Sequence, residues 1–470
     1  MVLSKQVIAR FFKLLRQALK GREYDYTSGS IRVAVFLLAI PMMLEMCLES
    51  VFAVVDIYFV NRLGPHAVSI VGLTEAFLTL VYSAAIGLSS AATAVVARRV
   101  GEKRPAEAAG AAAQSLIVSG VLILVLTVAG IVFAEDILLL MGAEGIAIKT
   151  GVNYTRIMLG GCAVVVLLFL INGIFRGAGN ASVAMRSLWL GNACNIVLCP
   201  LLINGYGPVP AMGISGAAIA SVSGRGIGVI YQLFHLFGKK GALNMREARW
   251  TPDWPVMKSL ISIATPATVQ FIVQSASWIF LAAIVARSGS EASAGYQTAI
   301  RLIVFFILPA WGISNAAATL VGQNLGARQP DRAVASVRTI ARYNTILMAA
   351  VMLLFLFFSG PLVGFFIPAT SWRELSIAVQ ALRIISTGYI LYGISMVLMQ
   401  AFNGAGDTRT PTLINFVGFW LLQIPMAWVL STTLHMGPQG VFIAIPAAEG
   451  IIAFIYLWYF RKGKWKMVQV

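Results

Sequence analysis

The sequence predicts an all-α integral membrane protein, with about twelve transmembrane helices arranged as two six-helix lobes related by an internal repeat. Composition gives the first reason: 59% of the 470 residues are hydrophobic, only 11% are charged, and the mean hydropathy is +0.84. The second reason is that apolar stretches long enough to cross ~30 Å of hydrocarbon recur along the chain. The third is the repeat, which predicts a site between or within the lobes.

The repeat is visible in the spacing of prolines and glycines. Pro266 follows Pro41 by 225 positions, and the same offset relates Gly64 and Gly289, Ala67 and Ala292, Gly101 and Gly326, and Pro105 and Pro330. Later, Arg176-Gly-Ala-Gly-Asn180 is echoed by Asn403-Gly-Ala-Gly-Asp407 with a slightly larger offset. Two copies of one membrane bundle are the usual build of a secondary transporter.

Breaks at Gly, Pro and charge clusters divide each copy into six expected helices. The first copy, the N-lobe of residues 33–237, has spans 33–61, 66–97, 108–134, 146–174, 183–204 and 212–237. The second, the C-lobe of residues 257–460, has spans 257–286, 291–322, 333–359, 374–402, 410–434 and 438–460. A basic amphipathic segment (1–32), a cytoplasmic linker (238–256) and a basic tail (461–470) complete the chain.

The position of the positive charge predicts the topology. The chain has 35 Lys and Arg against 18 Asp and Glu, a net charge of +17. Roughly 27 of these basic residues fall on the side that holds both termini, which is therefore expected to be cytoplasmic. The excess is a topology feature and argues against nucleic-acid binding. Residues 1–20 are expected to form an interfacial helix on the inner leaflet, with a solvated basic tail as the alternative.

Several other classes of protein are disfavoured. The four cysteines lie within expected helices without metal-ligand spacing, so neither a disulfide framework nor a metal site is predicted. No cofactor is expected, because the Gly-rich loops lack the Lys-Ser/Thr of a phosphate cradle. A membrane-embedded enzyme is disfavoured because the only histidines, His66, His235 and His435, lie near helix ends and form no protease motif.

Three carboxylates in the first expected helix are the main candidate site. Glu45, Glu49 and Asp56 share one stripe at 100° per residue, and such groups in hydrocarbon are costly and usually functional. A row of acids facing a cavity suggests proton loading and release, whereas static hydrogen bonds between helices are the alternative. Pro41 near the inner end removes a backbone hydrogen bond and gives this helix a bending point.

Two further acid–base pairs favour a structural interpretation. Glu75 and Arg225 lie in the second and sixth expected helices, and Arg301 and Glu449 lie at nearly matched positions of the second copy with the signs exchanged. An unpaired charge inside the membrane is penalised, so we expect one ion pair within each lobe. Glu75 is then a weaker candidate for a cavity residue with a transport role than Asp56.

The second copy of the first helix has no acid in its stripe. Gln270, Gln274 and Leu281 stand at those positions, and aromatic residues such as Trp278, Phe305 and Trp311 accompany them. The predicted chemistry is therefore asymmetric, with a protonatable first lobe beside a neutral, aromatic second lobe. Aromatic rings that line a cavity can stack on flat or cationic compounds, although packing and lipid contact are their commoner roles.

In these motifs the chain resembles the multidrug and toxic compound extrusion (MATE) family over nearly its whole length. The resemblance rests on the run from Pro41 to Gly64 with Val54-Val-Asp56, on Val321-Gly-Gln323-Asn-Leu-Gly326, on the two Gly-Ala-Gly loops and on Gly213-Ile-Ser-Gly216. It is closer to the DinF-like branch, which has a bending proline and an essential aspartate at the spacing of Pro41 and Asp56. The resemblance implies that Asp56 is the proton site and that the helix bends when Asp56 is protonated.

The sequence departs from the family pattern in the fifth expected helix. It reads Asn195-Ile-Val-Leu-Cys199-Pro200, so a cysteine stands where the family usually has an aspartate. Asn192 and Asn195 remain as candidate partners of Asp56, and Glu49 is a candidate to replace the missing acid. The NorM-like branch carries an acid where this chain has Gln274 and another in the tenth helix, so sodium coupling through the second lobe is disfavoured.

The resulting expectation is an antiporter that exports amphiphilic or cationic organic compounds in exchange for protons. We expect a monomer in a bacterial inner membrane, with both termini cytoplasmic and with small organic molecules, protons and the lipid bilayer as its partners. The alternatives are a lipid-linked precursor flippase, which should have a strongly basic cavity, and a sodium-coupled exporter.

Overall fold

The computed structural model describes residues 2–21, 24–143, 145–238, 243–246, 248–367 and 370–470. Side chains within this part are described except those of residues 2–8, 10, 52–58, 61, 65, 146 and 147. All of the regular structure in the described part is helical, apart from a single isolated bridge between Tyr206 and Val209.

The first half of the chain contains nine helices in the described residues. In chain order they are α1 (Val2–Lys20), α2 (Ile31–Asn61), α3 (Pro65–Gly101), α4 (Pro105–Val132), α5 (Ala134–Leu140), α6 (Ile146–Gly160), α7 (Cys162–Gly177), α8 (Ala181–Asn204) and α9 (Gly213–Leu236). α6 and α7 together form the single span expected over 146–174, interrupted at Gly161. α7 runs beyond the expected end, which brings Arg176 into the helix.

In the described residues, the second half has the same order of six membrane spans, although its spans are divided differently into helices. Its helices are α10 (Trp254–Ala286), α11 (Ser290–Gly326), α12 (Pro330–Gly364), α13 (Trp372–Ser386), α14 (Tyr389–Ala405), α15 (Arg409–Asn415), η1 (Phe416–Gln423), α16 (Ile424–Trp428), η2 (Val429–Thr433), α17 (Pro438–Lys462) and η3 (Lys464–Met467). α13 and α14 form one span bent by 58°. The segments from α15 to η2 form another span with π-helical turns.

The predicted fold class is confirmed. Among the described residues, 11 helices are long and apolar enough to cross a membrane, or up to 12 if the bent pair counts as one span. Every expected span coincides with one helix or one broken helix, and the ends differ by a few residues. The chain is a multi-pass membrane protein.

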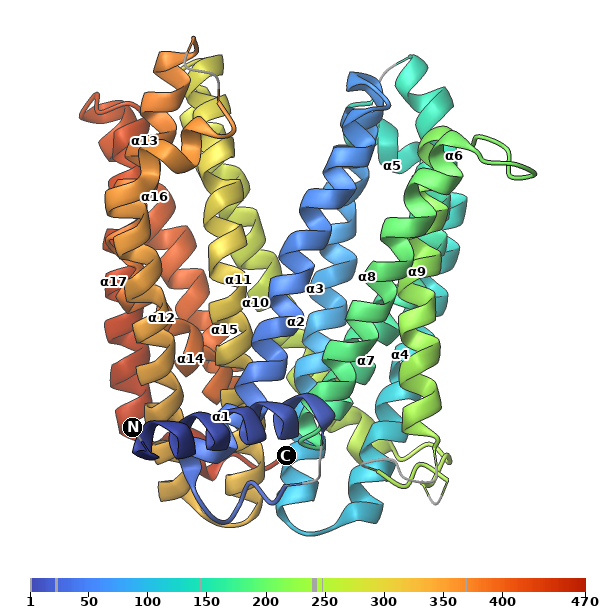
Figure 1. The fold of residues 1–470 in the computed structure, drawn as a ribbon, viewed down its shortest axis with the longest axis vertical. Coiled ribbons are helices and arrows are strands. Elements are labelled where there is room, and N and C mark those ends of the chain that lie inside the picture. Colours follow the sequence, from blue (N-terminus) through green and yellow to red (C-terminus); the bar gives the residue numbers. More distant parts are fainter. Residues whose placement is uncertain (1, 22–23, 144, 239–242, 247, 368–369) are drawn as a thin grey trace.

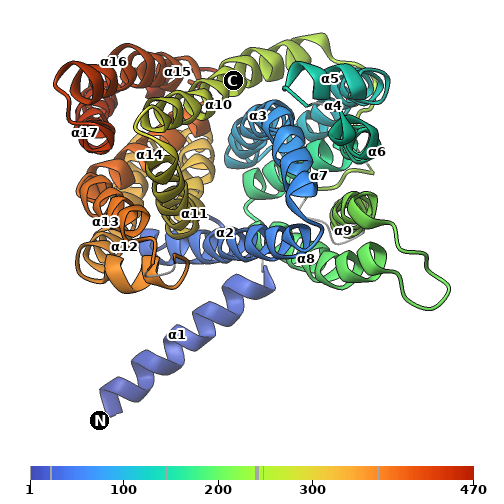
Figure 2. The same ribbon diagram turned by 90° about the horizontal axis from the view of Figure 1, so that it is seen from above.

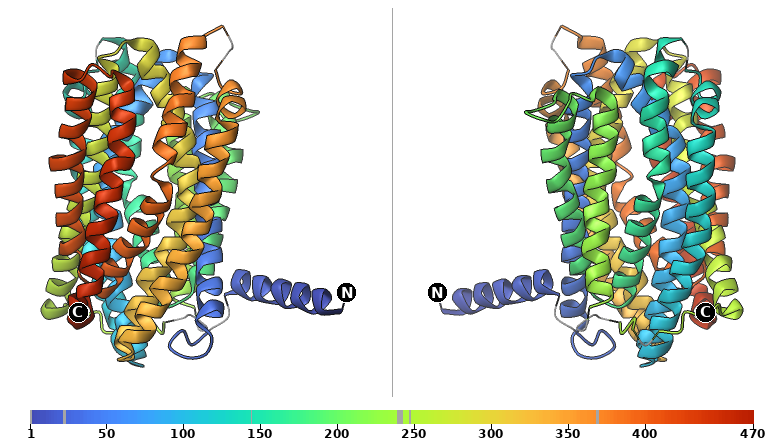
Figure 3. Two further views of the ribbon diagram at one scale, coloured as in Figure 1. Left: turned by 90° about the vertical axis from the view of Figure 1, so that its left-hand side faces the viewer. Right: turned by 90° about the vertical axis from the view of Figure 1, so that its right-hand side faces the viewer.

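The helices form two groups that meet at one end and diverge at the other (Figure 1). We call α2–α9 the N-lobe and α10–α17 the C-lobe. Both termini lie at the end where the lobes meet, which we call the termini end. α1 projects sideways from the bundle at this end, nearly perpendicular to the other helices, as expected for an interfacial helix (Figures 2 and 3). α2 and α10 each contact the opposite lobe, α2 through α11 and α10 through α3.

Glycines allow the two lobes to approach closely at the termini end. A Cβ atom on Gly101 would lie 2.0 Å from the Gln323 carbonyl oxygen, and one on Gly326 would lie 2.2 Å from the Arg98 carbonyl oxygen. These two contacts are related by the offset of 225, so the sequence repeat is also a spatial repeat. Gly87 against Ala264 and Gly312 against Met42 form a second pair of the same kind, beside Pro266 and Pro41.

The largest buried apolar cluster lies at the same end and is shared between the lobes. Leu38 and Met42 of α2 are fully buried and belong to one cluster with Leu320 of α11 and Phe402 of α14. The termini end is therefore a packed core that closes the space between the lobes, and it positions the first half of α2 against α11.

Candidate functional site

A cavity of about 220 Å³ lies between the lobes, next to this packed core. The N-lobe supplies its acidic and basic lining, Glu45, Glu49, Arg176 and Arg225, together with residues of α3 and α8. The C-lobe supplies neutral residues, which in chain order are Leu308, Trp311, Asn315, Ala318, Gln400 and Asn403. All four charged lining residues come from the N-lobe, whereas each lobe contributes one aromatic ring, Phe169 of α7 and Trp311 of α11.

Glu45 is held by a buried polar network within the N-lobe. It is 1% exposed and forms an ion pair with Arg176 of α7. Asn172, one turn earlier on α7, donates to the same carboxylate oxygen at 3.1 Å. Gln232 of α9 donates to Asn172 and, at 2.9 Å, to the hydroxyl of Ser187 of α8. Charge-assisted bonds of this kind fix the orientation of a buried carboxylate.

This network also reaches the other lobe. The Thr319 hydroxyl on α11 donates to the backbone carbonyl of Arg176 at 3.0 Å. One turn further along α11, the Gln323 amide donates to the carbonyl of Gly177 at 2.9 Å. A displacement of α11 from α7 would break both bonds, so the surroundings of Glu45 are coupled to the contact between the lobes.

Glu49 lies one turn beyond Glu45 on α2 and is half-buried in the cavity lining. It has no ion pair or hydrogen bond with any described side chain. Arg225 of α9 also lines the cavity, and its guanidinium donates to the Tyr82 hydroxyl of α3 at 2.6 Å. The expected ion pair of Arg225 with Glu75, which is exposed on α3, stays a prediction.

The C-lobe wall contains one aromatic ring, Trp311, and an amide chain. Trp311 stacks on Phe271 of α10 with ring centroids 5.6 Å apart. The Gln400 amide donates to Asn315, and Asn403 donates to Gln400 at 3.3 Å. This wall offers a flat apolar surface beside neutral hydrogen-bonding groups, and it adds no charge.

Asn192, Asn195 and Cys199 of α8 are absent from the described lining. The Asp56 side chain is outside the described part of the structure, although its backbone is helical. Asn192 and Cys199 are buried on α8, and Asn195 donates to Ser221 of α9 at 3.1 Å. Cys199 belongs to an apolar cluster with α9 and the end of α2. Contacts of these three residues with Asp56 stay predictions.

The C-lobe candidates are dispersed. Trp311 lines the central cavity, and Gln274 lines a small neighbouring one with it. Gln270 is fully buried, and neither atom of its amide has a hydrogen-bond partner among the described residues. Trp278 lines another small cavity inside the lobe, and Phe305 is 38% exposed. Only Trp311 of these five is placed to meet a ligand between the lobes.

The expected ion pair between Arg301 and Glu449 is wrong. Arg301 is exposed on α11, whereas Glu449 is buried on α17 and forms no ion pair within the described part of the chain. The physical reason is helix packing, because α17 packs against α13 and α14. Matched positions along two helices do not bring side chains together when other helices separate the two.

Comparison with known proteins gives the family. The model of the MatE family matches residues 41–201 and 266–429, one match in each half and together more than half of the chain. The chain belongs to the MATE family. Its two matches begin at Pro41 and Pro266, the prolines that reveal the repeat.

Relatives of this MATE chain cover nearly its whole length. It is 27% identical over 438 residues to the probable multidrug resistance protein YoeA of Bacillus subtilis, covering 92% of this chain and 94% of that protein. It is 26% identical to the probable multidrug resistance protein NorM of Thermotoga maritima, with 93% of each chain covered. A MATE transporter solved in an outward-facing conformation has the same fold, with a TM-score of 0.88, 24% identity and 94% and 98% of the two chains covered. The chain is thus a transporter and not an enzyme.

Sequence reasoning missed the network that holds Glu45. Arg176, Asn172 and Gln232 are absent from the predicted site residues, because the expected fourth span ends at residue 174 and leaves Arg176 in a loop. The available indication was the spacing of Asn172 and Arg176, four residues apart and therefore on one face of a helix.

Proposed function

We propose that this MATE-family chain exports amphiphilic or cationic organic compounds in exchange for protons. One observation carries the proposal: the cavity between the lobes has two carboxylates of α2 on one side and an aromatic, neutral wall on the other. A flat cation can meet a negative charge and an aromatic face in such a space. The names of the relatives, which include multidrug resistance proteins, support this class of substrate.

We propose that substrate and proton compete for the carboxylate of Glu49, which belongs to the described lining of the cavity. Glu49 faces the cavity without an ion-pair partner among the described residues, so its charge is available to a cationic ligand. Protonation removes that charge and weakens the attraction, which releases the substrate. Glu45, already bound by Arg176, would respond to the same proton only when its network opens.

Asp56 remains the proposed principal proton site by the family resemblance. It lies seven residues after Glu49 on α2, which is two turns toward the open end of the molecule. Protons entering from that end would reach Asp56 first and then Glu49. Pro41 would supply the bend, since it lies in α2 where Met42 packs on Gly312 of α11.

The arrangement of the lobes supports alternating access. The glycine contacts and the bonds of Thr319 and Gln323 close the termini end, whereas the ribbons diverge at the opposite end (Figure 1). If both termini are cytoplasmic, as the distribution of Lys and Arg predicts, this is an outward-facing state. We propose a bacterial inner membrane as the location, because the relatives named above are bacterial.

The alternative functions have less support in the cavity lining. A flippase for lipid-linked precursors should have a strongly basic cavity, but two arginines here face two carboxylates, and Arg176 is paired. A sodium-coupled exporter would need acids in the C-lobe wall, and the lining contributed by α11 and α14 is neutral.

The test is efflux of a fluorescent cationic dye from proteoliposomes, with an imposed pH gradient or an imposed sodium gradient. We expect the pH gradient alone to drive efflux. The Asp56→Asn variant should insert and fold but lose coupled efflux, because an amide keeps the polarity and cannot release a proton. Wild-type efflux by Asp56→Asn would refute the proton-site assignment, and efflux driven by sodium alone would overturn the coupling.

A further inference from the structure

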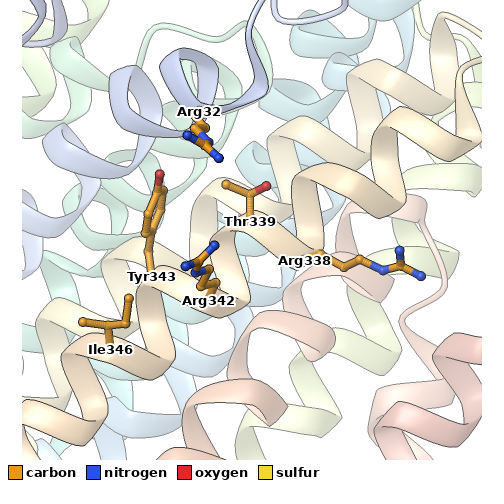
Figure 4. A pocket seen from close by; sticks show the side chains of 6 residues that line it. All are labelled: Arg32, Arg338, Thr339, Arg342, Tyr343 and Ile346. Atoms are coloured by element: carbon orange, nitrogen blue, oxygen red, sulfur yellow. The ribbon is translucent and has the colours of Figure 1, made fainter.

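A second cavity, of about 430 Å³, lies on the outside of the bundle at the termini end, away from the transport cavity. It lies between the start of α2 and the first half of α12, and its lining is strongly basic and hydroxylated (Figure 4). The lining residues are Arg32, Arg338, Thr339, Arg342, Tyr343 and Ile346. Figure 4 shows Arg32 facing Thr339, Arg342 and Tyr343 across one space. Arg338 lies at the side of this space.

No carboxylate of the described residues neutralises the positive charge of this cavity. All three arginines are exposed, and none forms an ion pair with a carboxylate of the described residues. Arg332, six residues before Arg338 on α12, differs in having its donors occupied, because its guanidinium donates to the carbonyls of Ser28 and Gly29. The arginines of the cavity therefore retain free donors for an external anion.

The surface next to the cavity is apolar and continues toward the middle of the molecule. Ile346, Leu353 and Phe357 follow one another on the same face of α12, at spacings of seven and four residues. They are 59%, 49% and 72% exposed. In a membrane protein, such a stripe lies against lipid chains, so the basic cavity stands at the polar end of a lipid-facing surface.

α1 places this cavity at the level of the lipid headgroups. The helix is amphipathic and basic, and it projects sideways from the bundle at the termini end (Figure 3). It meets α2 through Phe11 and Phe36, whose ring centroids are 5.7 Å apart. Helices of this type lie in the membrane interface with their apolar face in the acyl boundary. Arg32 follows in the first turn of α2, so the cavity opens at that same interface.

We propose that this cavity binds the phosphate headgroup of an anionic phospholipid. The guanidinium forks of Arg32 and Arg342 would bind the phosphate oxygens, and the hydroxyls of Thr339 and Tyr343 would donate to the remaining oxygens. Arg338 adds positive charge at the rim. The acyl chains would lie along Ile346 and the apolar face beyond it, which a soluble phosphate cannot use.

The bound lipid would connect two elements that belong to different lobes. Arg32 is at the start of α2, nine residues before Pro41, whereas Arg342 is on α12. A headgroup held by both would tether the inner part of α2 to the C-lobe. Anionic lipid is therefore expected to stabilise this arrangement of the lobes, independently of which compound the central cavity carries.

The test is a lipid titration of purified, delipidated protein in neutral detergent. Dioleoyl phosphatidylglycerol is compared with dioleoyl phosphatidylcholine and with inorganic phosphate, and the melting temperature and retained lipid are measured. We expect phosphatidylglycerol alone to raise the melting temperature and to be retained. The Arg32→Gln/Arg342→Gln double variant should need at least tenfold more of this lipid for the same shift.

The matched control is Lys258→Gln/Arg409→Gln, which removes two exposed cations elsewhere at the same end. It should change the lipid dependence less than twofold. A second variant, Arg342→Lys, keeps the charge but removes the fork and should give an intermediate loss. Because these side chains are exposed, we expect all variants to melt like the wild type without lipid.

Three outcomes would overturn the proposal. Equal losses in the two double variants would mean that lipid responds to total charge and not to this cavity. Equal stabilisation by phosphatidylcholine would remove the role of the anion. Saturable stabilisation by inorganic phosphate, abolished by Arg32→Gln/Arg342→Gln, would identify the ligand as soluble phosphate and exclude the lipid.

Discussion

Glu45 and Glu449 are the two carboxylates of the described chain that are less than a tenth exposed, and they lie in opposite lobes. Glu45 is surrounded by donors, with Arg176 and Asn172 on one of its oxygens, and it borders the central cavity. Glu449 has no ion pair or hydrogen bond to a described residue, and it borders two cavities of only about 20 Å³, in which Tyr392 is a common neighbour.

The difference shows that the two halves share their packing and not their polar chemistry. The close glycine contacts occur in pairs related by the repeat, so the backbone arrangement is the same in both copies. The charges do not follow the repeat in the same way. An ionised carboxylate is tolerated in a membrane protein where donors compensate its desolvation, and a neutral carboxyl group suits a site without them. We therefore expect charge-dependent function in the N-lobe.

The largest expected effect comes from breaking the Glu45–Arg176 pair on one side only. Arg176→Gln leaves a buried carboxylate without its cation, which should lower the stability by about 3–5 kcal/mol. The double variant Glu45→Gln/Arg176→Gln should recover much of this loss, because neither charge is then left alone. Thermal unfolding in detergent measures both; simple additivity of the two single changes would contradict the pairing.

The next largest expected effect tests the close glycine contacts, which are the part of the structure that the two lobes share. Gly101→Ala and Gly326→Ala each place a Cβ atom within about 2 Å of a backbone carbonyl oxygen of the other lobe. Each should cost about 1–3 kcal/mol and open the termini end, because one of the two helices must shift. The accessibility of a single engineered cysteine at that end reports the opening. Gly110→Ala is the control, since nothing lies within 4 Å of its added atom. Different responses of the two tested glycines would contradict a symmetric contact.

The sequence was sufficient for the helices because bilayer thickness fixes their length. Twelve apolar spans, one interfacial helix and the repeat follow from hydropathy, charge position and the spacing of prolines such as Pro41 and Pro266. The broken spans at Gly161 and between α13 and α14 were predicted as single helices, since a kink between apolar segments changes composition very little.

The site was only partly predictable. Glu45 and Glu49 were found because acids in hydrocarbon are rare, and both border the central cavity. The partners of Glu45 were missed because ion pairing depends on the rotation of neighbouring helices, and one residue of register turns a side chain by about 100°. The same dependence explains why the pairing of Arg301 with Glu449 was wrong.

The smallest effect concerns an exposed acid, which serves as a reference for the buried ones. Asp25 accepts from the side chain and backbone of Thr27 and from Lys103, and these contacts hold the pKa of its carboxyl well below its usual range. Its contribution to stability is therefore complete above about pH 4 and is lost as the pH falls toward the lowered pKa. Because Asp25 is largely exposed, Asp25→Asn should cost under about 1 kcal/mol at neutral pH.

The measurement of Asp25→Asn is the melting temperature between pH 3 and pH 7. The difference from the wild type should shrink toward the acidic end and at high salt. A difference that grows on acidification would contradict a lowered carboxyl pKa. A cost as large as that of Arg176→Gln would contradict the distinction between exposed and buried pairs.

The most direct test of proton coupling through the N-lobe is pH-gradient-driven dye efflux from proteoliposomes, compared between Glu49→Gln and Glu449→Gln at equal insertion. Both changes replace one carboxyl group by an amide of nearly the same size. We expect Glu49→Gln to lower the initial rate at least tenfold and to reduce its dependence on pH, and Glu449→Gln to keep both within about twofold of the wild type. Wild-type coupling in Glu49→Gln together with its loss in Glu449→Gln would contradict the account and would place the coupling acid in the C-lobe.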